Sequence, residues 1–285
     1  MVTHRALDNM IEEVKAHAQR IARVDHEAGR HVARMIPELE RLKAIVQRSP
    51  HTPVFFGHAH EFDHQFFTAD SIYSLPIYGP RREIFGAMFP SQPLDPLGPP
   101  RWSRTGLDRL KSRYTVSSRL DPISGMKRRF GWSQSLSALW ADEAKTKGII
   151  LTDVHSDGDG YFIKVDSGRT MQEVQVNGAN FARVQAANDH FRQAIRNEPN
   201  NLNINLGCRS ASGTAARENA EELHKLGINS NVYAARENVT LVGGSPPLET
   251  PFVDVGVHVP PGTSDTAEDH WAVYKRGQPA DRPEQ

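Results

Sequence analysis

The chain has 285 residues, and its 34 Lys and Arg balance its 34 Asp and Glu, so the formal net charge is zero. This length is enough to bury a full core, and a balanced charge gives no global attraction to nucleic acid or to an anionic membrane. A single cysteine excludes an internal disulfide framework and a multi-cysteine zinc site. We therefore expect a soluble protein that folds in a reducing compartment.

The first residues carry no sign of a targeting segment. They lack the apolar core of a signal peptide. Every apolar stretch is shorter than the roughly 20 residues that cross a bilayer. We expect a protein that is cytoplasmic when made and has no membrane span. If it is exported, we expect a route that needs no signal peptide.

Residues 1–50 are predicted to form a helical segment, because apolar residues recur at every third or fourth position between Leu7 and Val46. Gly29 and Pro37 interrupt it, and Pro37 is suited to opening a second helix because proline is tolerated in a first turn. We expect the segment to pack on the body of the protein. The alternative is an arm that oligomerises or docks a partner, such as a delivery or immunity protein.

Residues 51–147 are rich in proline, glycine and aromatic side chains, which predicts an elaborated loop region with one clear strand at 53–56. Basic residues gather between 101 and 129, and we interpret them as a solvated face, with no nucleic-acid partner. Residues 133–147 have helical spacing and end at Gly148, which is typical of a helix C-cap.

Residues 148–275 are predicted to form an α/β core. Strands are expected at 149–154, 201–206, 231–234 and 239–242, a hairpin at 161–176, and helices at 180–196 and 214–226. Alternating strands and helices indicate an α/β fold with a mostly parallel sheet and helices on both faces. The polar, proline-bearing residues 276–285 are expected to form a disordered tail.

Two reactive side chains follow predicted strands. His155 comes directly after the strand 149–154, and Cys208 follows the strand 201–206 at the start of a turn and helix. Ligands of parallel sheets gather at the carboxyl ends of strands, and a helix start stabilises a thiolate. A histidine that takes the thiol proton makes cysteine an effective nucleophile.

Further residues complete this predicted site. The backbone amides of Ser156 and Cys208 are candidates for holding an acyl oxyanion. Asp157 or Asp159 is a candidate for orienting the imidazole, although aspartates next to glycines also favour turns. The alternative for Cys208 is an inert structural residue, because lone cysteines often behave as small hydrophobes.

The stretches 149–155, 203–208 and 231–235 give the chain a resemblance to the caspase-like cysteine peptidases, especially the self-processing and effector domains of bacterial toxins. In that family a histidine ends one strand and the nucleophilic cysteine ends the next. The resemblance implies a caspase-like fold, a His155 and Cys208 dyad, a protein or peptide substrate, no cofactor and no metal. It also implies a bacterial effector that acts as a cysteine peptidase or related thiol hydrolase.

A histidine-rich stretch offers a second chemistry. His58, His60, Asp63 and His64 provide imidazole and carboxylate ligands that suit zinc. The stretch is similar to the metal-binding motif of metallo-β-lactamases, with one extra residue between His60 and Asp63. A metal-dependent hydrolase is therefore one alternative function, and a non-catalytic protein that binds a partner is another.

Overall fold

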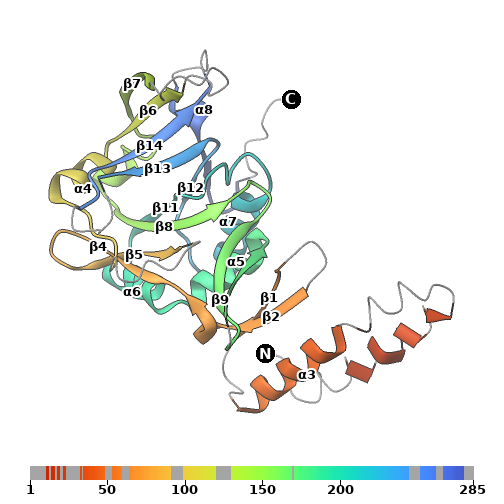
Figure 1. The fold of residues 1–285 in the computed structure, drawn as a ribbon. Coiled ribbons are helices and arrows are strands. Elements are labelled where there is room, and N and C mark those ends of the chain that lie inside the picture. Colours follow the sequence, from red (N-terminus) through yellow and green to blue (C-terminus); the bar gives the residue numbers. More distant parts are fainter. Residues whose placement is uncertain are drawn as a thin grey trace. The chain divides into compact units, whose positions relative to one another are not determined.

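The computed structural model describes the chain in two compact units (Figure 1). One unit comprises Met1–Ile72 with Val165–Val174, and the other comprises Tyr73–Lys164 with Gln175–Gln285. The residues described are 11–12, 14–16, 18–19, 22–23, 33, 35–48, 53–59, 64–90, 99–119, 130–168, 170–243, 251–260 and 266–278.

The first unit contains a helix and a β-hairpin. Helix α3 (Met35–Arg48) has Pro37 in its first turn, where proline is tolerated, and it buries Leu39. Strands β1 (Val54–His58) and β2 (His64–Thr68) pair antiparallel, followed by the short 3-10 helix η1 (Ala69–Ser71). The strand expected at 53–56 is thus confirmed as part of β1. Most of the predicted helical residues before α3 lie outside the described part of the chain.

The second unit is built on a mixed sheet with the strand order β4-β5-β8-β11-β12-β15. The four central strands β5, β8, β11 and β12 pair in parallel, whereas β4 and β15 pair antiparallel at the two edges. The bounds of these strands are β4 (Leu75–Tyr78), β5 (Ile84–Phe89), β8 (Gly148–Ser156), β11 (Asn201–Asn205), β12 (Val232–Ala235) and β15 (Trp271–Tyr274).

Three helices cover one face of this sheet. They are α5 (Gly178–Ala187), α6 (Asp189–Asn197) and α7 (Ala215–Lys225). A buried polar chain holds them to the sheet: Gln185 Nε2 donates to Thr152 Oγ1 of β8 at 2.8 Å, and Asn219 Nδ2 donates to Gln185 Oε1 at 2.7 Å. Buried hydrogen-bonded chains of this kind fix one geometry, because an unpaired buried group is costly.

A second, four-stranded sheet covers the opposite face. Its strand order is β13-β14-β6-β7, and its strands are β6 (Arg113–Arg119), β7 (Phe130–Ser137), β13 (Asn238–Val242) and β14 (Asp254–Val259). One hydrophobic core joins the two sheets, with Leu151 and Ile204 on one side and Val116 and Val257 on the other. Trp140 is fully buried there and donates from Nε1 to Leu110 O at 2.6 Å.

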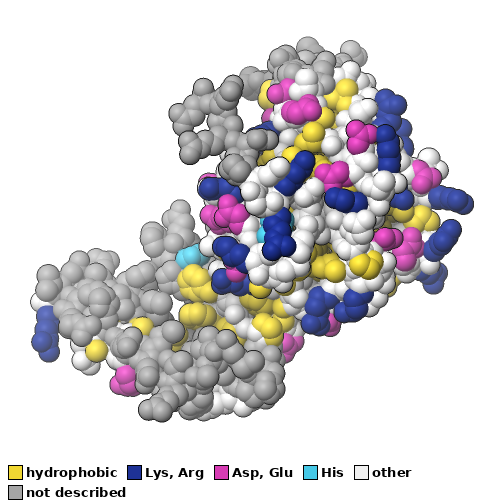
Figure 2. All heavy atoms as spheres, turned by 180° about the vertical axis from the view of Figure 1, so that it is seen from behind, with side chains coloured by type: hydrophobic (Ala, Val, Ile, Leu, Met, Phe, Trp, Pro, Cys, Tyr) yellow, Lys and Arg dark blue, Asp and Glu magenta, His cyan; other side chains and the backbone are white. Residues whose placement is uncertain are grey.

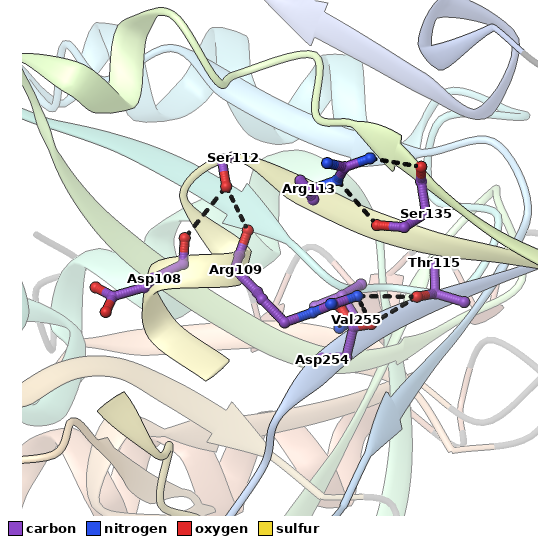
Figure 3. A network of polar contacts seen from close by, with 8 residues as sticks. All are labelled: Asp108, Arg109, Ser112, Arg113, Thr115, Ser135, Asp254 and Val255. Carbon is purple, nitrogen blue, oxygen red and sulfur yellow. Dashed lines mark hydrogen bonds and ion pairs between the residues drawn. The ribbon is translucent and has the colours of Figure 1, made fainter. Parts of the chain in front are cut away.

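Helix α4 (Arg104–Leu110) ties into this second sheet through charge (Figure 3). Arg109 Nη2 lies 2.8 Å from Asp254 Oδ2, and Thr115 Oγ1 donates to the same oxygen at 2.6 Å. Arg113 of the same basic stretch bonds Ser135 of the neighbouring strand. Two of the basic residues between 101 and 129 are thus engaged in structural contacts, rather than only lining a solvated face.

Short elements complete the fold. Strands β9 (Tyr161–Asp166) and β10 (Met171–Val176) form the expected hairpin, and β9 begins beside the end of β8. The remaining elements are β3 (Ile72–Tyr73), η3 (Glu143–Lys145) and α8 (Ala267–His270). Within the described residues, no helix has the length and apolar character needed to cross a membrane.

Three fold predictions need correction. The α/β class is confirmed, but the sheet is mixed and not mostly parallel, because β4 with β5, β8 with β9 and β12 with β15 pair antiparallel. A second sheet covers the face where helices were expected. The helix expected at 133–147 is strand β7 followed by η3. The helix expected at 180–196 is two helices, because Asn188 is extended and its side chain accepts from Phe191 N to cap α6.

Candidate active site

His155 and Cys208 line one cavity at the carboxyl ends of the parallel strands. The cavity has a volume of about 330 Å³. Four chain segments line it, namely Met88, Phe89 and Pro90 from the end of β5, Asp153, Val154 and His155 from β8, Leu206 and Cys208 after β11, and Val239, Thr240 and Leu241 from β13. The structure therefore brings the two predicted catalytic side chains to a single site.

The pairing of β8 explains this convergence. Asn205 of β11 lies beside Thr152, and the amide of Leu206 donates to Thr152 O at 2.8 Å. On the other side of β8, Met88 of β5 lies beside Asp153. Because neighbouring parallel strands end at the same edge, the residues that follow Thr152 and Asn205 meet beyond that edge.

Asp153 also lines the cavity and is not among the site residues predicted from the sequence. Thr152 bonds a helix on one face of the sheet, and side chains alternate along a strand. Asp153 and His155 therefore point to the other face, toward β13. Burial raises the pKa of Asp153 from its usual value to about 7. An aspartate inside the strand predicted at 149–154 is the signal that the sequence offers for it.

Cys208 docks on the backbone of β13. The amide of Val239 donates to Sγ at 3.4 Å, and the thiol donates to Val239 O at 3.5 Å. Burial raises the pKa of the Cys208 thiol, the Val239 backbone contact lowers it, and the nearby Asp153 carboxylate raises it again, for a net increase. At neutral pH the resting side chain is therefore a thiol and needs a base to become a nucleophile.

The turn that presents Cys208 is tightly held. The buried Asn205 side chain donates to Tyr161 Oη at 2.9 Å and accepts from the amide of Gly207 at 2.9 Å. Arg209 then adopts a left-handed backbone with φ of 54°, and its amide donates to Glu237 O. Helix α7 begins only at Ala215. The expected stabilisation of a thiolate by a helix start is therefore wrong, because this effect fades beyond the first turn.

His155 lies at the exposed rim of the cavity. Its ring packs on Phe162 of β9, with the ring centroids 5.4 Å apart. Asp157 is occupied by the loop that follows β8: Oδ1 accepts from the amides of Asp159 and Gly160, and Oδ2 accepts from Gln175. Within the described residues no hydrogen bond joins Asp157 or Asp159 to His155, so their orienting role stays a prediction.

The two expected oxyanion donors differ in position. Cys208 lines the cavity, whereas Ser156 does not. Ser156 is buried, pairs with Tyr161 of β9, and its Oγ accepts from the amide of Gly158 at 3.2 Å. Ser156 therefore shapes the turn after His155, and its role as an oxyanion donor stays a prediction.

The alternative metal site falls mainly outside the described residues. His58 and His64 lie opposite each other in the β1–β2 hairpin, but His60 and Asp63 are not described. In the part of the chain that is described, no group of three or more His, Cys, Asp or Glu side chains could hold a metal ion. Metal binding by this stretch stays a prediction.

Charged side chains of both signs are interspersed over the described surface seen in Figure 2. This mixture agrees with the zero net charge of the chain.

Comparisons with known proteins do not identify the chain. A scan against protein-family models, a search of curated proteins and a search of solved structures each gave no match. The function is therefore argued from the cavity and its residues.

Proposed function

We propose that the protein is a thiol hydrolase, a cysteine peptidase or a related acyl hydrolase, with Cys208 as nucleophile and His155 as general base. One observation carries the proposal: both side chains line the same cavity, at the ends of adjacent strands β8 and β11. A cysteine and a histidine that share a cavity are the minimum set for covalent acyl transfer.

Because the pKa of the Cys208 thiol is raised, His155 must accept the thiol proton before the sulfur can attack. The thiol turns away from Val239 O, His155 accepts its proton, and the sulfur attacks a peptide or ester carbonyl. The proton then passes to the leaving amine or alcohol, and water releases the acyl group from sulfur. The amide of Cys208 is the donor best placed for the oxyanion, because Cys208 itself lines the cavity.

The order of the two residues supports the caspase-like resemblance only in part. His155 and Cys208 follow neighbouring members of the parallel run β5, β8, β11 and β12. A peptide substrate and a role as a bacterial toxin or effector belong to the proposal through this resemblance alone.

A second candidate is a non-catalytic binding protein. The contacts between Cys208 Sγ and both backbone groups of Val239 favour it, because they give the thiol a purely structural task in joining the β11 end to β13. In that case the reactivity of the Cys208 thiol would not depend on His155.

Thiol reactivity separates the two candidates. We expect iodoacetamide to label Cys208 in the native protein near pH 7, and His155→Ala to slow this labelling by about tenfold or more, because the base that takes the thiol proton is lost. The measurement is the rate of adduct formation by intact-protein mass spectrometry.

The matched control is His190→Ala, which removes a histidine from helix α6 and should leave the rate unchanged. Labelling that requires denaturation, or equal rates in wild type and His155→Ala, would contradict the dyad.

A further inference from the structure

The cavity contains one acidic side chain among mostly apolar neighbours. Asp153 lies between Met88 of β5 and Leu206 after β11, and Leu241 of β13 also lines the space. In the described part of the chain, the Asp153 carboxyl has no hydrogen-bond or ion-pair partner. A half-buried carboxylate without a counter-ion is unfavourable, so its presence needs a reason.

The position of Asp153 relative to the reactive pair supplies that reason. Asp153 precedes His155 by two residues on the same face of β8, so it lies one pleat, roughly 6–7 Å, deeper along the strand. His155 is exposed and Asp153 is half-buried, so the cavity opens on the His155 side. Cys208 lines the same cavity, and the Asp153 carboxylate contributes to the raised pKa of its thiol. A group that enters past the thiol would reach the carboxylate at the inner end.

We propose that this cavity receives a cationic group, the ammonium or guanidinium of a substrate side chain, with Asp153 as its counter-ion. The apolar walls would hold the aliphatic stem, since lysine and arginine side chains bury their stems and pair their heads. The inference rests on the proposed thiol hydrolase and names its substrate class: peptides or esters with a basic residue on the acyl side of the bond that is cleaved.

The burial of Asp153 agrees with this role. Desolvation by burial disfavours the ionised carboxyl. A bound cation would favour the ionised form, so binding and ionisation would support each other. A neutral side chain would form no ion pair with Asp153, and an anionic side chain would be repelled by its ionised form, which gives selectivity by exclusion as well as by attraction.

Charge-selective thiol reagents test the proposal without requiring hydrolysis. In each methanethiosulfonate, the Cys208 sulfur attacks the sulfenyl sulfur, a disulfide forms and methanesulfinate leaves. We compare the aminoethyl reagent, which is cationic, with the sulfonatoethyl reagent, which is anionic, and the neutral methyl reagent. We expect the ratio of cationic to anionic rates to fall by about tenfold or more in Asp153→Asn.

The matched control is Glu221→Gln, which removes one negative charge from an exposed position on α7 and should leave the ratio unchanged. Asp153→Ser provides a second variant that should lower the ratio like Asp153→Asn. Equal ratios in wild type and both Asp153 variants would overturn the proposal, even if the protein hydrolyses substrates.

A binding measurement tests the cation site even if the Cys208 thiol does not react with these reagents. We expect n-butylammonium to raise the melting temperature of the wild type more than n-butanol does, and Asp153→Asn to abolish this difference. The absence of a difference in wild type would overturn the cation site. A difference that depends on Asp153, together with an inert Cys208, would keep the cation site and refute the hydrolase.

Discussion

Replacing Cys208 by alanine is expected to reduce hydrolysis by about 10³-fold or more, because covalent catalysis fails without its nucleophile. The fold should remain, since the substitution removes only a thiol and its weak contacts with Val239. The measurement is mass spectrometry of a peptide library after incubation with the protein. We expect new peptide termini with the wild type and none with the variant.

A neighbouring residue provides the control for this variant. Ser212 lies in the same turn, is exposed and donates to Arg209 O. Ser212→Ala should cleave the library as the wild type does. If Cys208→Ala produces the same new termini as the wild type, the nucleophile lies elsewhere and the thiol hydrolase is refuted.

Replacing Asp153 by asparagine is expected to stabilise the protein at alkaline pH. The pKa of Asp153 is raised from its usual value to about 7, so between about pH 4 and pH 7 the folded state holds a proton that the unfolded state has released. Stability of the wild type therefore falls as the pH rises through this window. The full shift corresponds to about 4 kcal/mol, which partial exposure of the side chain reduces to roughly 2 kcal/mol.

Denaturant unfolding at several pH values measures this effect. We expect the difference in unfolding free energy between Asp153→Asn and wild type to grow by roughly 2 kcal/mol from pH 4 to pH 8. A constant offset from the new amide does not affect this change. Glu221→Gln should show no comparable change with pH. A difference that stays constant across the range would mean that Asp153 ionises freely in the folded protein.

Local pattern predicted much of the α/β core. Strands β8, β11 and β12 and helix α7 lie within a few residues of their predicted bounds. The signals are local: apolar runs in β8 and β12, alternating leucine and isoleucine in β11, and a closing glycine at 227 after α7. Pro76 argues against a strand in the sequence, so β4 is not predicted. The proline is tolerated there because β4 is an edge strand. The sequence predicts a helix where β7 lies, because its partner strand β6 comes from a segment with the composition of a loop.

The site was only partly predictable for a related reason. His155 and Cys208 could be placed at strand ends from the sequence, and the parallel pairing of β8 with β11 brings those ends together. The wall formed by Val239 and Leu241 depends on β13 joining a second sheet, a long-range choice that no local signal encodes. Because the position of β13 is not predictable, the sequence alone does not show that the Asp153 carboxyl is buried.

Acetylation by p-nitrophenyl acetate is the decisive test of a His155 and Cys208 hydrolase, because it needs no knowledge of the natural substrate. We expect a burst of one nitrophenol per chain, an acetyl group on Cys208 in the intact and digested protein, and a much slower burst in His155→Ala. Absence of acetyl-Cys208 in the folded wild type, or the same burst rate in wild type and His155→Ala, would contradict a His155 and Cys208 hydrolase.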